Sequence, residues 1–315
     1  MDSTKLQRVL IFFCCLLAQA ASAQVYQWTD ENGRVRFGDR PPAHAETQSL
    51  EFEEATPRSQ PGVEVRIEIE EFSLSPAARE KVDRALPLII NTYKQLFRLD
   101  MRKPTVVRLA LLEDKSSMDR WVKARLPDYL PAPLLGIYLV KSREVGVWNH
   151  GDEDAVVSTI LHEASHVIVA QLSPYAPSWL QEGLAGYFQE SEITDAGLRI
   201  PPSAFNLGMI RRWVDNGELI TLRRYLGIDE RSWREMAHNA SAIPYTVAWG
   251  MTHFLLSHEQ GRNTLRRVLQ DMEKIQRWPT LEDMNHYYPG GLTRMDFEFF
   301  KWAQADVEAH SYPTR

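Results

Sequence analysis

The chain is predicted to be an α+β protein, because two kinds of hydrophobic pattern occupy different halves of it. Between residues 63 and 148, residues 63–72 alternate apolar and charged side chains, and three further short apolar runs have the pattern of β-strands. After Gly151, apolar residues recur three and four positions apart almost to the end, which is the pattern of helices. A mostly β half followed by a mostly α half favours an α+β domain over alternating βαβ units. We expect an antiparallel or mixed sheet followed by a helical half.

Each element of this fold has its own local signal. Strands are predicted at 63–72, 105–112, 136–140 and 144–148, the last two joined by a charged turn. Ser75-Pro76 opens a helical pattern that runs towards Phe97, and a short helix is expected near residues 118–126. Further helices are expected around residues 163, 184, 210, 250, 267 and 300.

The composition limits the classes of function. The chain has 315 residues, 44% of them hydrophobic and 25% charged, enough for one large domain and an accessory one. A formal charge of −6, with arginine pairs spread among acidic and apolar residues, predicts no nucleic-acid partner. Both cysteines, Cys14 and Cys15, lie near the N-terminus.

The first 23 residues predict a cleavable signal peptide. Lys5 and Arg8 precede an apolar stretch from Val9 to Ala18, and Ala21-Ser22-Ala23 forms a small-residue cleavage site. Cleavage near Ala23–Gln24 would release a periplasmic or secreted protein without a membrane span. The mature chain would then contain no cysteine, which excludes disulfides, a thiol nucleophile and cysteine metal ligands. An uncleaved anchor or a buried helix is the alternative.

Residues 24–42 predict a β-hairpin, since two alternating runs flank the turn sequence Asp30-Glu31-Asn32-Gly33. Residues 43–62 are rich in Glu, Ser, Thr and Pro and predict a linker to a domain over 63–315. The patterns Tyr-x-Trp-x-Asp-x-x-Gly and Phe-x-Asp-x-Pro-Pro resemble a small module of unknown function found after the signal peptide of proteobacterial envelope proteins. Its expected role is to bind an envelope protein partner.

The chemistry is predicted to centre on His162-Glu163-Ala164-Ser165-His166. Residues four apart on a helix project from one face, so both imidazoles can reach one Zn²⁺ while Glu163 lies beside the bound water. A core helix with two hydrogen-bonded histidines is the other interpretation.

A third ligand is predicted on the next helix. Residues 177–188 begin with Pro177-Ser178 and continue as an apolar-periodic run, which places Glu182 in the first turns of a helix. Glu182 follows His166 by 16 residues, enough for one helix to end and a second to return. A carboxylate there completes a His₂Glu set and leaves the fourth zinc position to water.

With Trp-Leu-x-Glu-Gly-x-Ala after His-Glu-x-x-His, the chain resembles the gluzincin metallopeptidases, and more closely the bacterial peptidase MA-like branch, loosely over residues 150–260. The resemblance implies a zincin-like domain, zinc on His162, His166 and Glu182, and Glu163 as the general base of peptide-bond hydrolysis. Some gluzincins carry an acidic residue four positions after the glutamate ligand, where this chain has Gly186.

The sequence identifies the orienting carboxylates and the oxyanion donor less clearly than the metal ligands. Asp152, Glu153 and Asp195 are the candidates for orienting the histidines. Gluzincin-like sites often stabilise the oxyanion with a downstream tyrosine or histidine, and here Tyr245 is the first candidate and His253 the second. For both, helix packing is the alternative, and Tyr187 is expected in the core.

The substrate is expected to bind in extended form. The run 136–148 is predicted to offer a strand edge to a peptide, with Trp148 and Asn149 nearest the metal, and an interior hairpin is the alternative.

Three functions remain open. The first is a zinc endopeptidase of the cell envelope that acts on proteins or peptides, favoured over an aminopeptidase because no Gly-x-Met-Glu-Asn motif is present. The second is a binding or assembly factor that keeps the fold without turnover. The third is a zinc amidase that acts on cell-wall peptide.

Overall fold

A computed structural model describes residues 25–29, 35–38, 48–50, 63–101, 103–128, 134–174, 176–239 and 242–313. The chain divides into two compact units, Met1–Ser59 and Gln60–Arg315. The predicted signal peptide, residues 1–23, lies outside the described residues.

The first unit contains a three-stranded antiparallel sheet. Its strands are β1 (Val25–Thr29), β2 (Val35–Gly38) and β3 (Gln48–Leu50), in the order β2-β1-β3. β1 and β2 pair in antiparallel fashion, as the hairpin predicted from the sequence requires. β3 lies within residues 43–62, for which the sequence predicts no regular structure. A strand of three residues is too short to show alternation, and its pairing with β1 depends on backbone groups rather than on side-chain pattern.

The second unit is built on a four-stranded mixed sheet. Its strands are β4 (Val63–Glu70), β5 (Thr105–Leu112), β6 (Gly136–Leu139) and β7 (Glu144–Trp148), in the order β4-β5-β7-β6. β4, β5 and β7 are parallel, and β6 is antiparallel to β7 at one edge. The α+β class and the mixed sheet are confirmed. The sequence favoured this class over alternating βαβ units, and one such unit is nevertheless present, because α1 (Pro76–Phe97) forms the long crossover that parallel β4 and β5 require.

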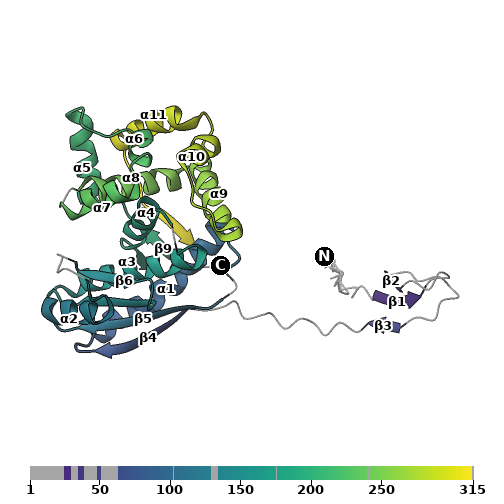
Figure 1. Cartoon of the computed structure of the whole chain (residues 1–315). Coiled ribbons are helices and arrows are strands. Elements are labelled where there is room, and N and C mark those ends of the chain that lie inside the picture. Colours follow the sequence, from purple (N-terminus) through teal and green to yellow (C-terminus); the bar gives the residue numbers. More distant parts are fainter. Residues whose placement is uncertain are drawn as a thin grey trace, which may run out of the picture. The chain divides into compact units, whose positions relative to one another are not determined.

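Helices cover both faces of this sheet. Alternate residues of β5, Val107, Leu109 and Leu111, belong to the main core, which also includes buried residues of α1 and of α3 (Glu153–Leu172). The opposite face carries Ala110 and Leu112, which pack with α2 (Lys115–Arg125) in a smaller cluster. α3 lies next to β6 and β7 along the sheet (Figure 1). Among the described residues it is the one helix long and apolar enough to cross a membrane, but it is a buried core helix here.

The C-terminal half is helical and lies on one side of the sheet and its helices (Figure 1). It contains α4 (Ser178–Phe188), α5 (Ala204–Asp215), α6 (Leu222–Leu226), α7 (Glu230–His238), α8 (Ile243–Ser257), α9 (Glu259–Ile275), α10 (Leu281–Tyr287) and α11 (Gly291–Gln304). A small antiparallel sheet joins β8 (Glu192–Thr194), β9 (Gly197–Ile200) and β10 (His310–Pro313). The sequence patterns predicted the longer helices and missed α6, α7, α10 and these three strands.

α4 packs closely against α8, and a glycine permits it. A Cβ atom on Gly183 would lie 2.4 Å from Oγ1 of Thr252 and 2.7 Å from the carbonyl oxygen of Ala248. A Cβ on Gly186 would meet only ordinary contacts, the nearest at 3.8 Å on Trp249. The position of α4, and of Glu182 on it, therefore depends on the absence of a side chain at residue 183.

Candidate metal centre

α3 brings His162 and His166 to one face. The helix begins at its N-cap Asp152, whose carboxylate accepts hydrogen bonds from the backbone N–H groups of Asp154 and Ala155. Its apolar side chains are buried, so packing fixes the rotation of the helix about its axis. The two imidazole rings lie one turn apart with their centroids 4.9 Å from each other.

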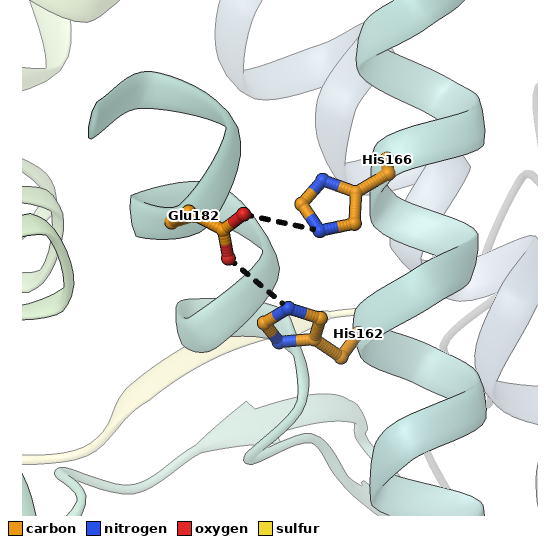
Figure 2. Close-up of side chains that lie close together, drawn as sticks. All are labelled: His162, His166 and Glu182. Carbon is orange, nitrogen blue, oxygen red and sulfur yellow. Dashed lines mark ion pairs between the residues drawn. The ribbon is translucent and has the colours of Figure 1, made fainter. Parts of the chain in front are cut away.

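Glu182 reaches both histidines from α4, as Figure 2 shows. Its two carboxylate oxygens lie 3.3 Å from Nε2 of His162 and 3.7 Å from Nε2 of His166. Ligand atoms of a tetrahedral zinc ion are about 3.3 to 3.6 Å apart, from zinc–ligand distances near 2.0 to 2.2 Å. The three side chains are at most 20% exposed, and they form the group within the described residues that could hold a metal ion.

A hydrogen bond from outside this group sets the tautomer of His162. Nδ1 of His162 lies 2.8 Å from the amide oxygen of Gln189, the C-cap residue of α4. An amide oxygen only accepts, so Nδ1 carries the proton, and a neutral ring then directs the lone pair of Nε2 at Glu182. A lone pair facing a carboxylate requires a cation between them, either a proton or a metal ion.

The pKa values of His162 and Glu182 also indicate that this site stabilises positive charge. Burial lowers the pKa of His162, but the hydrogen bond and charge of Glu182, with the charge of Glu163, outweigh it and raise the value to about 9. Burial lowers the pKa of His166 to about 4, so this ring is neutral near pH 7 and its lone pair is available to a metal. The histidine charges hold the pKa of Glu182 below its ordinary value in spite of burial.

Glu163 lies beside the centre and is held by the edge of the sheet. It is 7% exposed. Burial raises its pKa to about 7, while the backbone N–H of Tyr138 in β6 donates to its carboxylate. A carboxylate with a pKa near neutrality is suited to accept a proton at one step and return it at the next.

β6, rather than β7, is the strand at this edge. A Cβ atom on Gly136 would lie 2.9 Å from Cγ of Glu163, so the first residue of β6 contacts the candidate base. β7 is paired on both sides, which makes Val145 an interior residue with no exposed surface. The prediction that 136–148 as a whole forms the edge was therefore wrong for β7.

Trp148 and Asn149 also differ from their predicted place. The indole N–H of Trp148 donates to the carbonyl of Leu134, and the side chain packs with the α2 cluster. The backbone N–H of Asn149 donates to the carbonyl of Leu112. Gly136 and Tyr138 of β6 contact Glu163 instead.

Tyr245 lies in the first turn of α8, 44% exposed, with its ring against that of Trp233 at a centroid distance of 5.3 Å. Burial, together with the charges of Glu182 and Glu163, raises its pKa to about 12. A phenol that remains protonated is a hydrogen-bond donor at neutral pH. Tyr225, which the sequence did not single out, donates to the carbonyl of Pro244 and so fixes the start of α8.

His253 does not contribute to this centre. It lies eight residues after Tyr245 on α8, about 12 Å further along the helix axis. It is fully buried, and its ring packs against His310 at a centroid distance of 4.1 Å. The helix-packing interpretation applies to it. Tyr187 is a core residue, as predicted, and its hydroxyl contacts Nδ1 of His310 and the hydroxyl of Tyr312.

None of the three carboxylates expected to orient the histidines contacts them in the structure described. Asp152 caps α3, and Glu153 accepts hydrogen bonds from the backbone N–H and hydroxyl of Ser75. Asp195 lies in the exposed turn between β8 and β9. The orienting group is the amide of Gln189, seven residues after Glu182 and so on the same face of α4. This seven-residue spacing from Glu182 is the sequence signal that could have identified Gln189.

Comparison with known families gives two matches. Residues 156–276, which include the whole candidate centre, match the family described as "Protein of unknown function (DUF1570)". Residues 12–70 match the family described as "Domain of unknown function (DUF4124)". Neither description assigns an activity. No curated protein and no solved structure matches the chain.

Proposed function

We propose that the chain is a zinc-dependent endopeptidase of the cell envelope. One observation carries the proposal: two histidines of one helix and a carboxylate of another converge with the spacing of metal ligands, while Glu163 lies between them and the edge of a sheet. The predicted signal peptide supports a location in the periplasm or outside the cell.

The donor set suits zinc. Two imidazole nitrogens and a carboxylate oxygen are the protein ligands of one class of catalytic zinc site, in which the fourth position stays open. Zinc bound there would lower the pKa of a water molecule and polarise the carbonyl of the scissile peptide bond.

The protein groups around the ion have separate tasks in this proposal. Glu163 takes the proton from the attacking water and passes it to the leaving amine. Its contact with the N–H of Tyr138 keeps the carboxylate oriented. Tyr245 donates a hydrogen bond to the oxyanion that develops on the substrate. Gln189 accepts the hydrogen bond from Nδ1 of His162, which leaves Nε2, on the side of Glu182, to bind the ion.

The edge of β6 would bind the substrate backbone. It is unpaired on its outer side within the described sheet, and an extended peptide can add to such an edge through main-chain hydrogen bonds. Because this binding mode reads the backbone along its length, it favours cleavage inside a chain.

A binding factor without turnover is the second candidate, and His166 is the observation that favours it. A histidine that ligates a metal usually donates its other ring N–H to a partner. Nδ1 of His166 is buried and has no such partner among the described residues. An amidase that acts on cell-wall peptide would use the same chemistry on a different substrate.

Metal analysis coupled to an activity assay tests the proposal. The mature chain, residues 24–315, is purified as wild type, Glu163→Gln, Glu182→Ala and the exposed control Glu308→Ala. Zinc content is measured in each sample, together with cleavage of an unstructured protein and of cell-wall peptide.

We expect one zinc ion per chain in the wild type and in Glu163→Gln, less in Glu182→Ala, and cleavage only by the wild type and the control. Zinc without cleavage of either substrate would favour the binding factor. Cleavage of cell-wall peptide alone would favour the amidase, and absence of zinc from all samples would reject the metal centre.

A further inference from the structure

A cavity of about 780 Å³ lies near the candidate centre. Tyr138 of β6 and Val140, which directly follows the strand, line one side, and Val167 and Gln171 of α3 line another. Val167 directly follows His166, and Tyr138 is the residue whose backbone N–H donates to Glu163. Residues of the same two elements, β6 and α3, therefore line the cavity and contribute to the candidate centre.

Cations dominate its charged lining. Four basic side chains and two acidic ones face it, a formal balance of +2 in a chain with a net charge of −6. They are Lys103, Arg108, Arg143 and Lys274, with Asp100 and Glu273.

Some of the basic side chains that line the cavity have no acidic partner in the described part of the chain and so remain available to a ligand. Glu273 is engaged, because its carboxylate accepts hydrogen bonds from the backbone N–H groups of Asp100 and Met101. Arg108 lies 3.6 Å from Glu68 on the neighbouring strand. Lys103, Arg143 and Lys274 are exposed and make no ion pair with any residue that the structure describes.

The rest of the lining is largely apolar and includes Pro104, Val106, Val140 and Leu172. An apolar wall with three cations suits a ligand that has a carbon chain and ends in a carboxylate. The side chain of an aspartate or glutamate in a peptide has this chemistry.

The register of β6 connects this chemistry to the candidate centre. The strand runs from Gly136, beside Glu163, to Leu139, and Val140 at the cavity follows directly. At about 3.3 Å per residue, four residues of extended chain span roughly 13 Å. Because Glu163 contacts both Gly136 and Tyr138, a peptide paired with β6 and cleaved beside Glu163 would carry a side chain over the cavity about two to four residues from the cleaved bond.

We infer that this cavity binds the carboxylate side chain of an extended acidic peptide that lies along β6, with Lys103, Arg143 and Lys274 as the recognising groups. The inference rests on the proposed function for the consequence that cleavage selects such peptides. The binding itself is independent of turnover.

Peptide binding to the Glu163→Gln protein tests the inference without cleavage. The probes are fluorescein-labelled, otherwise uncharged 12-residue peptides that carry one glutamate at successive positions, each paired with a glutamine twin. Affinity is measured by fluorescence anisotropy in the Glu163→Gln background. The test variant adds Lys103→Gln, Arg143→Gln and Lys274→Gln, and the matched control adds Lys123→Gln, Arg212→Gln and Lys301→Gln, which are exposed and lie outside the cavity.

An exposed ion pair contributes about two- to fivefold in affinity, so three cations together should favour the glutamate peptide by on the order of tenfold. We expect this preference at a limited set of positions, its loss in the test variant, and its retention in the control. If the triple variant does not fold, Lys103→Gln and Lys274→Gln alone should each reduce the preference.

Equal binding of glutamate and glutamine peptides, or equal effects of the test and control variants, would overturn the inference. Cleavage assays with the protein that retains Glu163 separate it from the proposed function. Cleavage without acidic preference would reject the cavity assignment and keep the peptidase. Acidic preference in binding without any cleavage would keep the cavity assignment and reject the peptidase.

Discussion

Gln189 accepts a hydrogen bond from Nδ1 of His162 at 2.8 Å, and this contact decides which ring nitrogen faces Glu182. The donor and acceptor lie on different helices, so the amide couples the end of α4 to the middle of α3. Partners of this kind orient a metal-ligating histidine and raise its basicity.

Removal of this partner should weaken metal binding while the three ligands remain. We expect Gln189→Ala to lower zinc affinity by about 10- to 100-fold, measured by competition with a chromophoric chelator. Gln189→Glu keeps an acceptor at the same place and should retain affinity. Equal affinities in all three proteins would show that the contact does not orient a metal ligand.

Gly183 and Gly186 form a matched pair on α4. Gly183→Ala should destabilise the fold by about 1 to 3 kcal/mol, because its Cβ would lie 2.4 Å from Oγ1 of Thr252. Gly186→Ala meets no close contact and should be neutral or stabilise the helix by up to about 1 kcal/mol. Urea denaturation measures both. Similar midpoints for the two variants would contradict the close approach of α4 to α8.

Gly136 should affect turnover rather than metal content, if the proposed function holds. An alanine there would place its Cβ 2.7 Å from Thr159 and 2.9 Å from Cγ of Glu163, which displaces the candidate base. We expect kcat to fall by about 10- to 100-fold in Gly136→Ala with zinc retained, since a small misplacement of a catalytic group has effects of this size. Gly208→Ala, where nothing lies within 4 Å of the added Cβ, is the control.

The buried pair His253 and His310 should make the fold sensitive to acid. Burial lowers their pKa values to about 3 and about 4, and the charge of Arg262 also lowers that of His310. An unfolded histidine gains its proton near pH 6.5, whereas these rings stay neutral in the folded state. Stability is therefore lost as the pH falls below about 6.5, by roughly 1.4 kcal/mol per pH unit for His253.

Urea denaturation between pH 7 and pH 4 measures this dependence. We expect His253→Phe to reduce the slope of stability against pH, and the exposed control His286→Phe to leave it unchanged. A slope in His253→Phe equal to that of the wild type would show that His253 is not the acid-sensitive group.

Local signals explain why much of the fold could be predicted. Ser75 caps α1 and Pro76 starts it, and the helix ends at Phe97 as the pattern indicates. The alternation of residues 105–112 matches β5 at both ends. The candidate ligands were predictable because His162 and His166 are related by helix geometry alone.

The remaining features depend on contacts between distant segments. β10 pairs with β9, so that His310 lies opposite Ile200, and no local pattern specifies such a partner. The order β5-β7-β6 places β6 at the edge although β7 is nearer to α3 in sequence. The spacing from Glu182 puts Gln189 on the correct face of α4, but its contact with His162 also depends on how α4 packs against α3, which no local pattern specifies.

The close packing of α4 on α8 has an evolutionary consequence. Two candidate ligands are carried by a helix anchored on the sheet, and the third by a helix anchored on α8. Substitutions at Ala248 or Thr252 would shift Glu182 relative to both histidines without altering any ligand. If the proposed metal site holds, natural variation along α8 would tune the affinity of the site for its ion, and so adapt the protein to compartments in which the metal is scarce or abundant.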